Sequence, residues 1–207
     1  MKAHRPWTAI SSIAVLVFST ATLAALADTA QKNLVVNGDF ESGNTGFTSA
    51  YTYGDVSGPG AYFIGKNPSQ APGGFGDWCN CGDHTSGTGN MMIVNGGDSA
   101  SSAVWEESVT VTPSTDYIFS YWAAEVDHDS NSLPHLLTKI NGQSMGSSFL
   151  PEHSPDNGGR WENHTFKWNS GSSKSAQLAI FDLNTDSAWN DFMLDDISFS
   201  QVKADAQ

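Results

Sequence analysis

The sequence has few positive charges. It contains 9 Lys and Arg residues against 22 Asp and Glu in 207 residues, which gives a formal net charge of −13 at pH 7. A surface of this sign repels phosphate backbones and anionic lipids, so nucleic acid and membrane surfaces are excluded as expected partners. The acidic surplus is equally compatible with calcium binding, with neutral glycans and with solubility alone.

Long hydrophobic runs are also scarce. One run, residues 13–25, follows Lys2, His4 and Arg5 and precedes a small-x-small cleavage site at 25–27. This pattern is typical of a secretory signal peptide, so we expect residues 1–27 to be removed. A single domain at 28–207 remains, and no membrane insertion is expected. The expected location is secreted or extracellular, with the periplasm or the cell surface as alternatives.

No window shows a sustained helical period. Short apolar or alternating runs are separated by Gly, Asn, Asp, Ser and Pro clusters, which predicts an all-β fold: an antiparallel β-sandwich of two packed sheets. Asn141-Gly142 predicts a tight hairpin turn. The expected strands are residues 33–37, 48–53, 61–64, 90–94, 103–111, 116–125, 135–140, 147–150, 161–168, 175–182 and 192–202.

The last expected strand changes phase at its centre. Apolar residues stand at Phe192 and Leu194 and then at Ile197 and Phe199, on either side of two aspartates. Because the side-chain period of a strand is two, this change requires an extra residue in the ladder, and we predict a β-bulge there. By parity Asp195 shares the inward face of Ile197 and Phe199, where a carboxylate needs hydrogen bonds or a cation.

Segments at both ends of the chain resemble a known family. Phe192 to Phe199, together with Asn33-Leu-Val-Val-Asn-Gly-Asp-Phe-Glu41, is similar to the two termini of jelly-roll carbohydrate-binding modules of the galactose-binding-like superfamily, as found in secreted bacterial surface proteins. Between them the order of motifs recurs, so the resemblance covers about residues 33–202. It implies a jelly-roll fold, and it says less about the ligand.

The resemblance also implies a structural calcium ion between the first and last strand regions. Residue by residue, Glu41 and Asp195 match the side-chain ligands, and Asp39 could replace Glu41. Oxygen donors from distant segments suit calcium, which accepts irregular geometry and backbone carbonyls. Calcium is the cofactor expected for this chain.

The only two cysteines are Cys79 and Cys81, with His84 close behind them. Three interpretations stay open: a disulfide, which is the default in an exported chain; zinc or copper bound with His84; and free thiols. The general pattern of the resembled modules has no such cysteines, so this loop departs from it.

Carboxylates offer two further alternatives. Asp127 opens a segment that begins like an EF-hand loop, but Ser132 and Thr138 replace the required Gly and Glu, so that motif fails. Candidates for paired catalytic carboxylates are Glu106, Glu107, Glu125 and Asp127, although sequence spacing fixes no distance between strands. An enzyme is possible and unsupported.

Tryptophans in polar loops are the best candidates for ligand contacts. Trp78 and Trp189 lie in loops rich in Gly, Asn and Asp, where a large exposed aromatic favours a ligand, and indole faces stack on sugar rings. The alternative for each is a loop anchor that folds back on the sandwich. The predicted ligand-binding set is Trp78, Trp189, Tyr53, Asp83, Asn190 and Asp191. We expect the two tryptophan loops to meet at one end of the sandwich, and the alternative location is the sheet face carrying Tyr121 or Trp122.

Together these features predict a secreted, non-catalytic carbohydrate-binding module stabilised by calcium, with a glycan or polysaccharide as partner. The alternatives are a structural or adhesive matrix protein and, less favoured, a polysaccharide hydrolase or lyase on the same fold. Neither the sugar nor the oligomeric state is indicated by the sequence.

Overall fold

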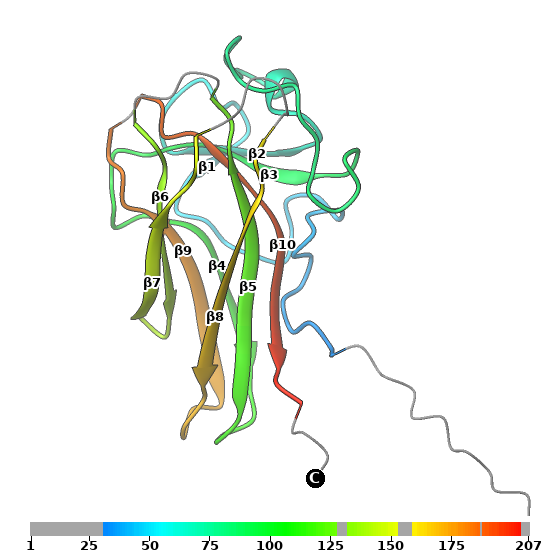
Figure 1. The fold of residues 1–207 in the computed structure, drawn as a ribbon, viewed down its shortest axis with the longest axis vertical. Coiled ribbons are helices and arrows are strands. Elements are labelled where there is room, and N and C mark those ends of the chain that lie inside the picture. The colour runs from blue at the N-terminus through cyan, green and yellow to red at the C-terminus, as the bar shows by residue number, and fades with distance from the viewer. Residues whose placement is uncertain (1–30, 128–131, 153–158, 187, 204–207) are drawn as a thin grey trace, which may run out of the picture. The chain divides into compact units, whose positions relative to one another are not determined.

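Ten strands build two sheets in the computed structural model, which describes residues 31–127, 132–152, 159–186 and 188–203. The six-stranded sheet has the order β1-β2-β3-β10-β5-β8, and the four-stranded sheet has the order β4-β9-β6-β7. All neighbouring strands pair antiparallel except β1 and β2 (Figure 1). The all-β antiparallel sandwich predicted from the sequence is confirmed.

Most strand bounds follow the expected runs, but β1 is shorter than the expected run 48–53, and β7 begins earlier than the expected run 147–150. The bounds are β1 Thr52–Tyr53, β2 Ala61–Gly65, β3 Met91–Asn95, β4 Ala103–Thr110, β5 Asp116–Glu125, β6 His135–Ile140, β7 Gln143–Phe149, β8 Glu162–Asn169, β9 Ser175–Asp182 and β10 Phe192–Gln201. The one helical element in the described part of the chain is a 3-10 turn, η1, at Pro68–Gln70. Asn141 and Gly142 have φ angles of 51° and 76° between β6 and β7, as the predicted hairpin turn requires.

Residues 33–37 are not a strand, although the sequence predicts one. The segment lies beside β10 and is held by separate bonds: the Leu34 amide donates to the Phe199 carbonyl at 2.8 Å, and the Ile197 amide donates to the Gly38 carbonyl at 2.8 Å. Gly38 is required here because an added Cβ would stand 2.0 Å from the Ile197 carbonyl oxygen. The beginning and the end of the described chain are therefore fixed side by side.

The main core fills the space between the sheets. It includes Trp105 of β4, Phe119 and Tyr121 of β5, Ile180 of β9 and Phe199 of β10. The alternation of aromatic residues along β5 places its odd-numbered side chains up to Ala123 in this core. Tyr121 is therefore inaccessible, and the even-numbered Trp122 points to the opposite, outer face of the six-stranded sheet.

A second hydrophobic cluster lies on that outer face. Met91, Ile93, Ala124 and Met193 of the sheet pack there against Trp78 and other residues of the segment 66–90, which we call the cysteine loop. In Figure 1 this loop lies over the upper part of β2 and β3. The cysteine loop thus covers the part of the outer sheet face that carries these residues.

Candidate functional site

The β-bulge in β10 is present, and it changes the expected place of Asp195. Asp195 pairs with Trp122, Ser198 pairs with Ser120, and the register shifts between them. Asp196 has a φ of 49°. Because the extra residue follows Asp195, its side chain lies on the outer face, opposite to that of Ile197 and Phe199, and the parity argument is corrected on this point.

Asp195 is nevertheless buried, because the cysteine loop closes over it. Its Oδ2 accepts hydrogen bonds from the backbone amides of His84 at 2.9 Å and Thr85 at 3.3 Å, and its Oδ1 accepts one from Asp196 at 2.8 Å. The side chain is 0% exposed, and this loss of hydration raises the pKa of the Asp195 carboxyl to about 7. The carboxylate anchors the loop through its amides.

Glu41 contacts the C-terminal end of the cysteine loop, at Asn90. Its Oε1 accepts a hydrogen bond from the Asn90 amide at 2.6 Å, while the rest of the residue is exposed. Asp83 lies next to it: a Cβ added at Gly89 would meet both Glu41 Oε1 and Asp83 Oδ2, at 2.1 and 3.0 Å. No described group of three or more His, Cys, Asp or Glu side chains is placed to hold a metal ion.

Asp83 does not face a ligand cavity. It is 4% exposed, and its carboxylate accepts the amide hydrogens of Ser86 at 2.8 Å and Gly89 at 2.6 Å, which closes a turn in the cysteine loop. It is not among the described residues that line the cavity described below, so its place in the ligand-binding set stays a prediction.

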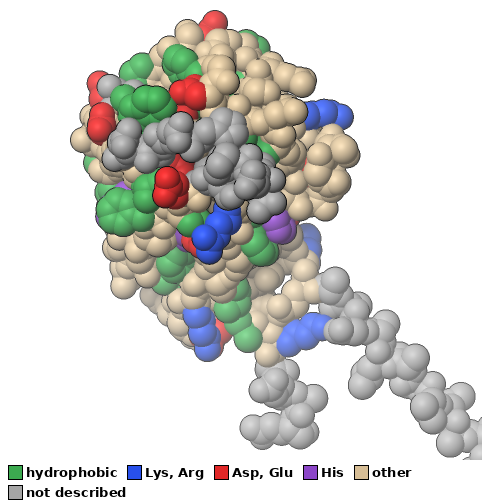
Figure 2. Space-filling model, turned by 45° about the horizontal axis from the view of Figure 1, so that its top comes forward, with side chains coloured by type: hydrophobic (Ala, Val, Ile, Leu, Met, Phe, Trp, Pro, Cys, Tyr) green, Lys and Arg blue, Asp and Glu red, His purple; other side chains and the backbone are tan. Residues whose placement is uncertain are grey.

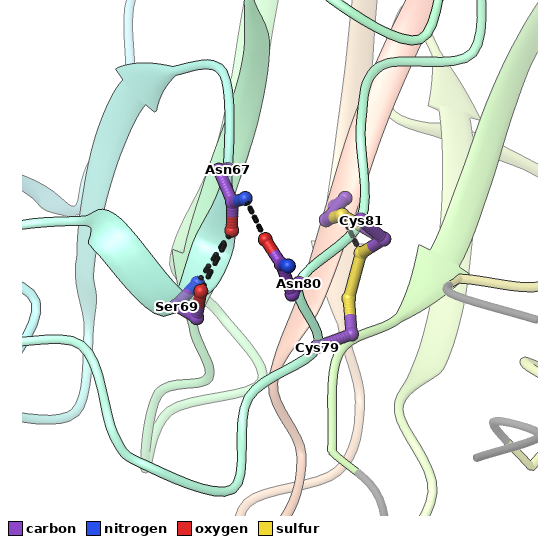
Figure 3. Close-up of a disulfide and its surroundings, with 6 residues drawn as sticks. Asn67, Ser69, Cys79, Asn80 and Cys81 are labelled. Atoms are coloured by element: carbon purple, nitrogen blue, oxygen red, sulfur yellow. Dashed lines mark hydrogen bonds between the residues drawn. A yellow bond between two sulfur atoms is a disulfide. The ribbon is translucent and has the colours of Figure 1, made fainter. Parts of the chain in front are cut away.

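The structure joins Cys79 and Cys81 in a disulfide, the first of the three interpretations (Figure 3). Both cysteines are buried in the second hydrophobic cluster. The Asn80 side chain between them accepts a hydrogen bond from Asn67, and Asn67 also caps η1. A metal site made of these cysteines and His84 does not form, because the sulfur atoms are paired.

His84 instead belongs to an aromatic cluster on the outer face. Its ring stacks on Trp122 with centroids 3.8 Å apart, meets the edge of Trp161 at 5.8 Å, and bonds to Asp196 through Nδ1 at 2.7 Å. We call these four residues the histidine cluster. It occupies the alternative location expected for a ligand, and the stacked imidazole covers part of the Trp122 face.

A cavity of about 270 Å³ lies at the end of the sandwich where β3 and β5 end and β10 begins. We call it the loop-end cavity. It brings together residues from five separate segments. Two of these segments are the loops that carry Trp78 and Trp189, which were expected to meet. Its lining consists of Ser57, Pro59, Phe75, Asp77, Asn95, Asp127, Ala188, Trp189 and Asp191.

Two aromatic rings of this cavity face solvent. Trp189 is 37% exposed and Phe75 is 43% exposed. Trp189 has a φ of 72°, a left-handed conformation that bulky residues rarely adopt. Figure 2 shows hydrophobic and acidic side chains side by side at the corresponding end of the molecule.

Asp191 lines this cavity and is hydrogen-bonded to the buried Trp78. Asp191 Oδ2 accepts a hydrogen bond from the Trp78 indole at 3.1 Å, and Oδ1 accepts one from the Gly96 amide at 2.9 Å. Burial raises the pKa of the Asp191 carboxyl to about 6. Trp78 itself is only 2% exposed, so the expectation of an exposed indole is wrong: its ring fills the second hydrophobic cluster.

Asn190 and Tyr53 do not line the cavity. Asn190 is fully buried, and its amide group donates to Asp182 Oδ2 at 3.1 Å and to the Asn184 carbonyl at 3.0 Å, so it fixes the loop that carries Trp189. Tyr53 is 47% exposed, but it lies on β1 and stacks on Phe63 with centroids 6.1 Å apart.

Asp127 is the residue that sequence reasoning undervalued. It is 2% exposed, it lines the cavity, and its Oδ2 accepts no hydrogen bond from any described residue. Burial, followed by the neighbouring charges of Asp191, Asp77 and Glu125, raises the pKa of its carboxyl to about 8. Phe75 was also missed, although an aromatic flanked by Gly74 and Gly76 is an unusual feature of a loop.

No protein-family model matches the sequence, and no curated protein does. Solved structures with a similar fold include the CBM22-1 xylan-binding domain of Xyn10C from Paenibacillus barcinonensis (16% identity, 84% of this chain and 97% of that one, TM-score 0.52). TmCBM61 in complex with β-1,4-galactotriose is similar at 13% identity, over 83% and 99% of the chains, with a TM-score of 0.51.

An apo cyclase from Fischerella sp. is similar at 9% identity, over 84% and 97% of the chains, with a TM-score of 0.56. This chain also spans 21 to 49% of the length of several longer structures. At such identities the likeness shows the fold. The chain folds as the jelly-roll β-sandwich that carbohydrate-binding modules share with at least one enzyme.

Proposed function

We propose that this protein is a secreted carbohydrate-binding module that binds its glycan at the loop-end cavity without altering it. The observation that carries the proposal is the exposed Trp189 indole beside three aspartates. Sugar rings present apolar C–H faces and a rim of hydroxyl groups, and this pairing of an aromatic face with acceptor oxygens matches both. Two structures with this fold, a xylan-binding domain and a galactotriose complex, support the same class of ligand.

The size of the cavity limits what enters it. Small-molecule sites usually have volumes of about 300 to 1,000 Å³. At about 270 Å³ the loop-end cavity is just below this range. It therefore suits one sugar ring at a time, with the rest of a chain outside. The left-handed backbone of Trp189 is costly, and such strain is typical of functional positions.

A glycan array tests the proposal. Wild-type protein should retain at least one glycan, and Trp189→Ala should weaken retention by about 1 to 3 kcal/mol, as the loss of an aromatic anchor does. Phe149→Ala is the matched control, because Phe149 is also an exposed aromatic, at 60%, but lies on β7 in the other sheet. Equal retention by wild type and Trp189→Ala would place the site elsewhere.

Calcium is the second part of the proposal, with Glu41 and Asp195 as side-chain ligands. Their donor chemistry fits the ion. Asp195 is a buried carboxylate without a Lys or Arg partner among the described residues, and its Oδ1 accepts only one hydrogen bond there, from Asp196. The bond between Ile197 and Gly38 holds the two segments together. When bound, the ion would offset the buried charge and link the first segment to β10.

An adhesive matrix protein and a hydrolase are the rival functions. The specific observation that favours a hydrolase is the pair Asp127 and Asp191, two carboxyls of raised pKa in one cavity. Incubation of the retained glycan with the protein distinguishes a hydrolase from a binding module. A hydrolase releases new reducing ends, which can be measured, and a binding module does not. Failure of the folded protein to retain any glycan would favour the adhesive role.

A further inference from the structure

One oxygen of the loop-end cavity lacks a partner. Asp127 Oδ2 is buried and accepts no hydrogen bond in the described part of the chain, while Asp191 uses both of its oxygens for Trp78 and Gly96. A buried acceptor without a donor costs about 1 to 3 kcal/mol, and more when charged. A ligand that brings a donor to this oxygen recovers that free energy.

The surroundings favour a positively charged donor. Three of the nine described lining residues are aspartates, and none of these nine is Lys, Arg or His. Trp189 and Phe75 add aromatic faces, which attract cations through the ring quadrupole. A metal ion is disfavoured because both oxygens of Asp191 already accept hydrogen bonds from Trp78 and Gly96, which leaves too few free oxygen ligands. An organic cation that also has an apolar face fits these observations best.

We propose that the loop-end cavity recognises a sugar carrying a protonated amino group, of the glucosamine type, with the ammonium on Asp127 and the ring against Trp189. This inference rests on the proposed function, and it names the class of glycan. An ammonium group supplies three donors and a charge, whereas a hydroxyl supplies one donor and no charge. N-acetylation removes the charge, and a uronic acid would be repelled by the aspartates.

Binding also moves a proton. Burial holds the pKa of Asp127 near 8, with Asp191, Asp77 and Glu125 as the charged neighbours that face it. An ammonium beside this carboxyl favours its ionised form, so the carboxyl releases its proton to the buffer when the amino sugar binds near pH 7. The measured binding enthalpy should therefore depend on the ionisation enthalpy of the buffer.

Isothermal titration with three matched ligands tests the inference on the wild-type protein. β-1,4-linked tetramers of glucosamine, N-acetylglucosamine and glucose differ at the 2-position alone. We expect the glucosamine tetramer to bind at least about tenfold more tightly than the other two, since one charge-assisted bond contributes about 1.5 kcal/mol or more. The titrations are run in EDTA and repeated with calcium.

Two variants test whether Asp127 causes the preference for the glucosamine tetramer. Asp127→Asn should reduce the preference for the amino sugar to about threefold or less, while residual stacking on Trp189 remains. Asp186→Asn is the control, because Asp186 is exposed and belongs to the same loop as Trp189 but does not line the cavity. Its preference should match that of the wild type.

The outcomes separate the two proposals. If a neutral tetramer binds as tightly as the glucosamine tetramer, the amino-sugar inference is wrong and the binding function stands. If Asp127→Asn keeps the full wild-type preference for the glucosamine tetramer, both in EDTA and with calcium, the ammonium does not lie on Asp127 and the inference is also wrong. If no glycan of any class binds to the folded protein, the proposed function itself fails.

Discussion

Replacement of Asp127 by Asn should make the protein more stable above about pH 4, by an amount that grows until about pH 8. The folded-state pKa of Asp127 is raised from 3.8 to about 8 by burial. In the unfolded chain the carboxyl ionises near pH 4. The folded state therefore holds a proton that the unfolded state releases, so the free energy of unfolding falls as the pH rises from about 4 to about 8.

The size of the effect follows from the shift. At 1.36 kcal/mol per pH unit, a rise from 3.8 to about 8 costs roughly 5 kcal/mol of stability at pH 8. Asparagine has the same shape and no charge to desolvate. We expect Asp127→Asn to be about 2 to 5 kcal/mol more stable than wild type at pH 8, because the variant removes the cost of ionising this buried carboxyl beside Asp191. At pH 4 the two proteins should be nearly equal.

Thermal unfolding at pH 4, 6 and 8 without glycan provides the assay. For a domain of this length the gain at pH 8 corresponds to a Tm higher by roughly 5 to 15 °C. Asp186→Asn controls for removal of an exposed negative charge on the same side of the chain, and its Tm difference should be small at every pH. A Tm difference for Asp127→Asn that does not grow between pH 4 and pH 8 would refute the reasoning.

Three further predictions concern the remainder of the fold. A chelator should lower the Tm of wild type and leave that of Asp195→Ala unchanged; an equal response in both proteins would remove Asp195 from the proposed calcium site. Alkylation under non-reducing conditions should label neither Cys79 nor Cys81, whereas two labelled thiols in the exported protein would contradict the pairing. Gly38→Ala should destabilise the protein by about 1 to 3 kcal/mol in urea unfolding, because the added Cβ would stand 2.0 Å from the Ile197 carbonyl oxygen. An unchanged unfolding midpoint would show that the backbone accommodates the Cβ without loss of stability.

The sheets were predictable because strand patterns are local. Alternation along β5 and the phase change in β10 identified buried faces and the bulge without knowledge of any contact. Residues 33–37 looked like a strand because their composition suits one, but side-chain bonds from Asn33 to Ile197 and Phe199 replace a regular ladder there. The position of the bulge relative to Asp195 depends on which residue is unpaired, and parity alone cannot specify that.

The candidate site was predictable only in part. The meeting of the loops and the exposure of Trp189 followed from polar loop composition. Trp78 has the same sequence surroundings, yet it is buried because the cysteine loop folds back over the outer face of the sheet. That fold-back depends on contacts between distant segments, such as the bond from Trp78 to Asp191. The unpartnered oxygen of Asp127 depends on such contacts too.

A crystal structure of the protein with its retained oligosaccharide tests the central claim most directly. The account predicts one sugar ring in the loop-end cavity, with its C–H face against the Trp189 indole and a donor group within hydrogen-bond distance of Asp127 Oδ2. A sugar bound instead on the histidine cluster, with Trp161 as its platform and the loop-end cavity free of it, would contradict the account.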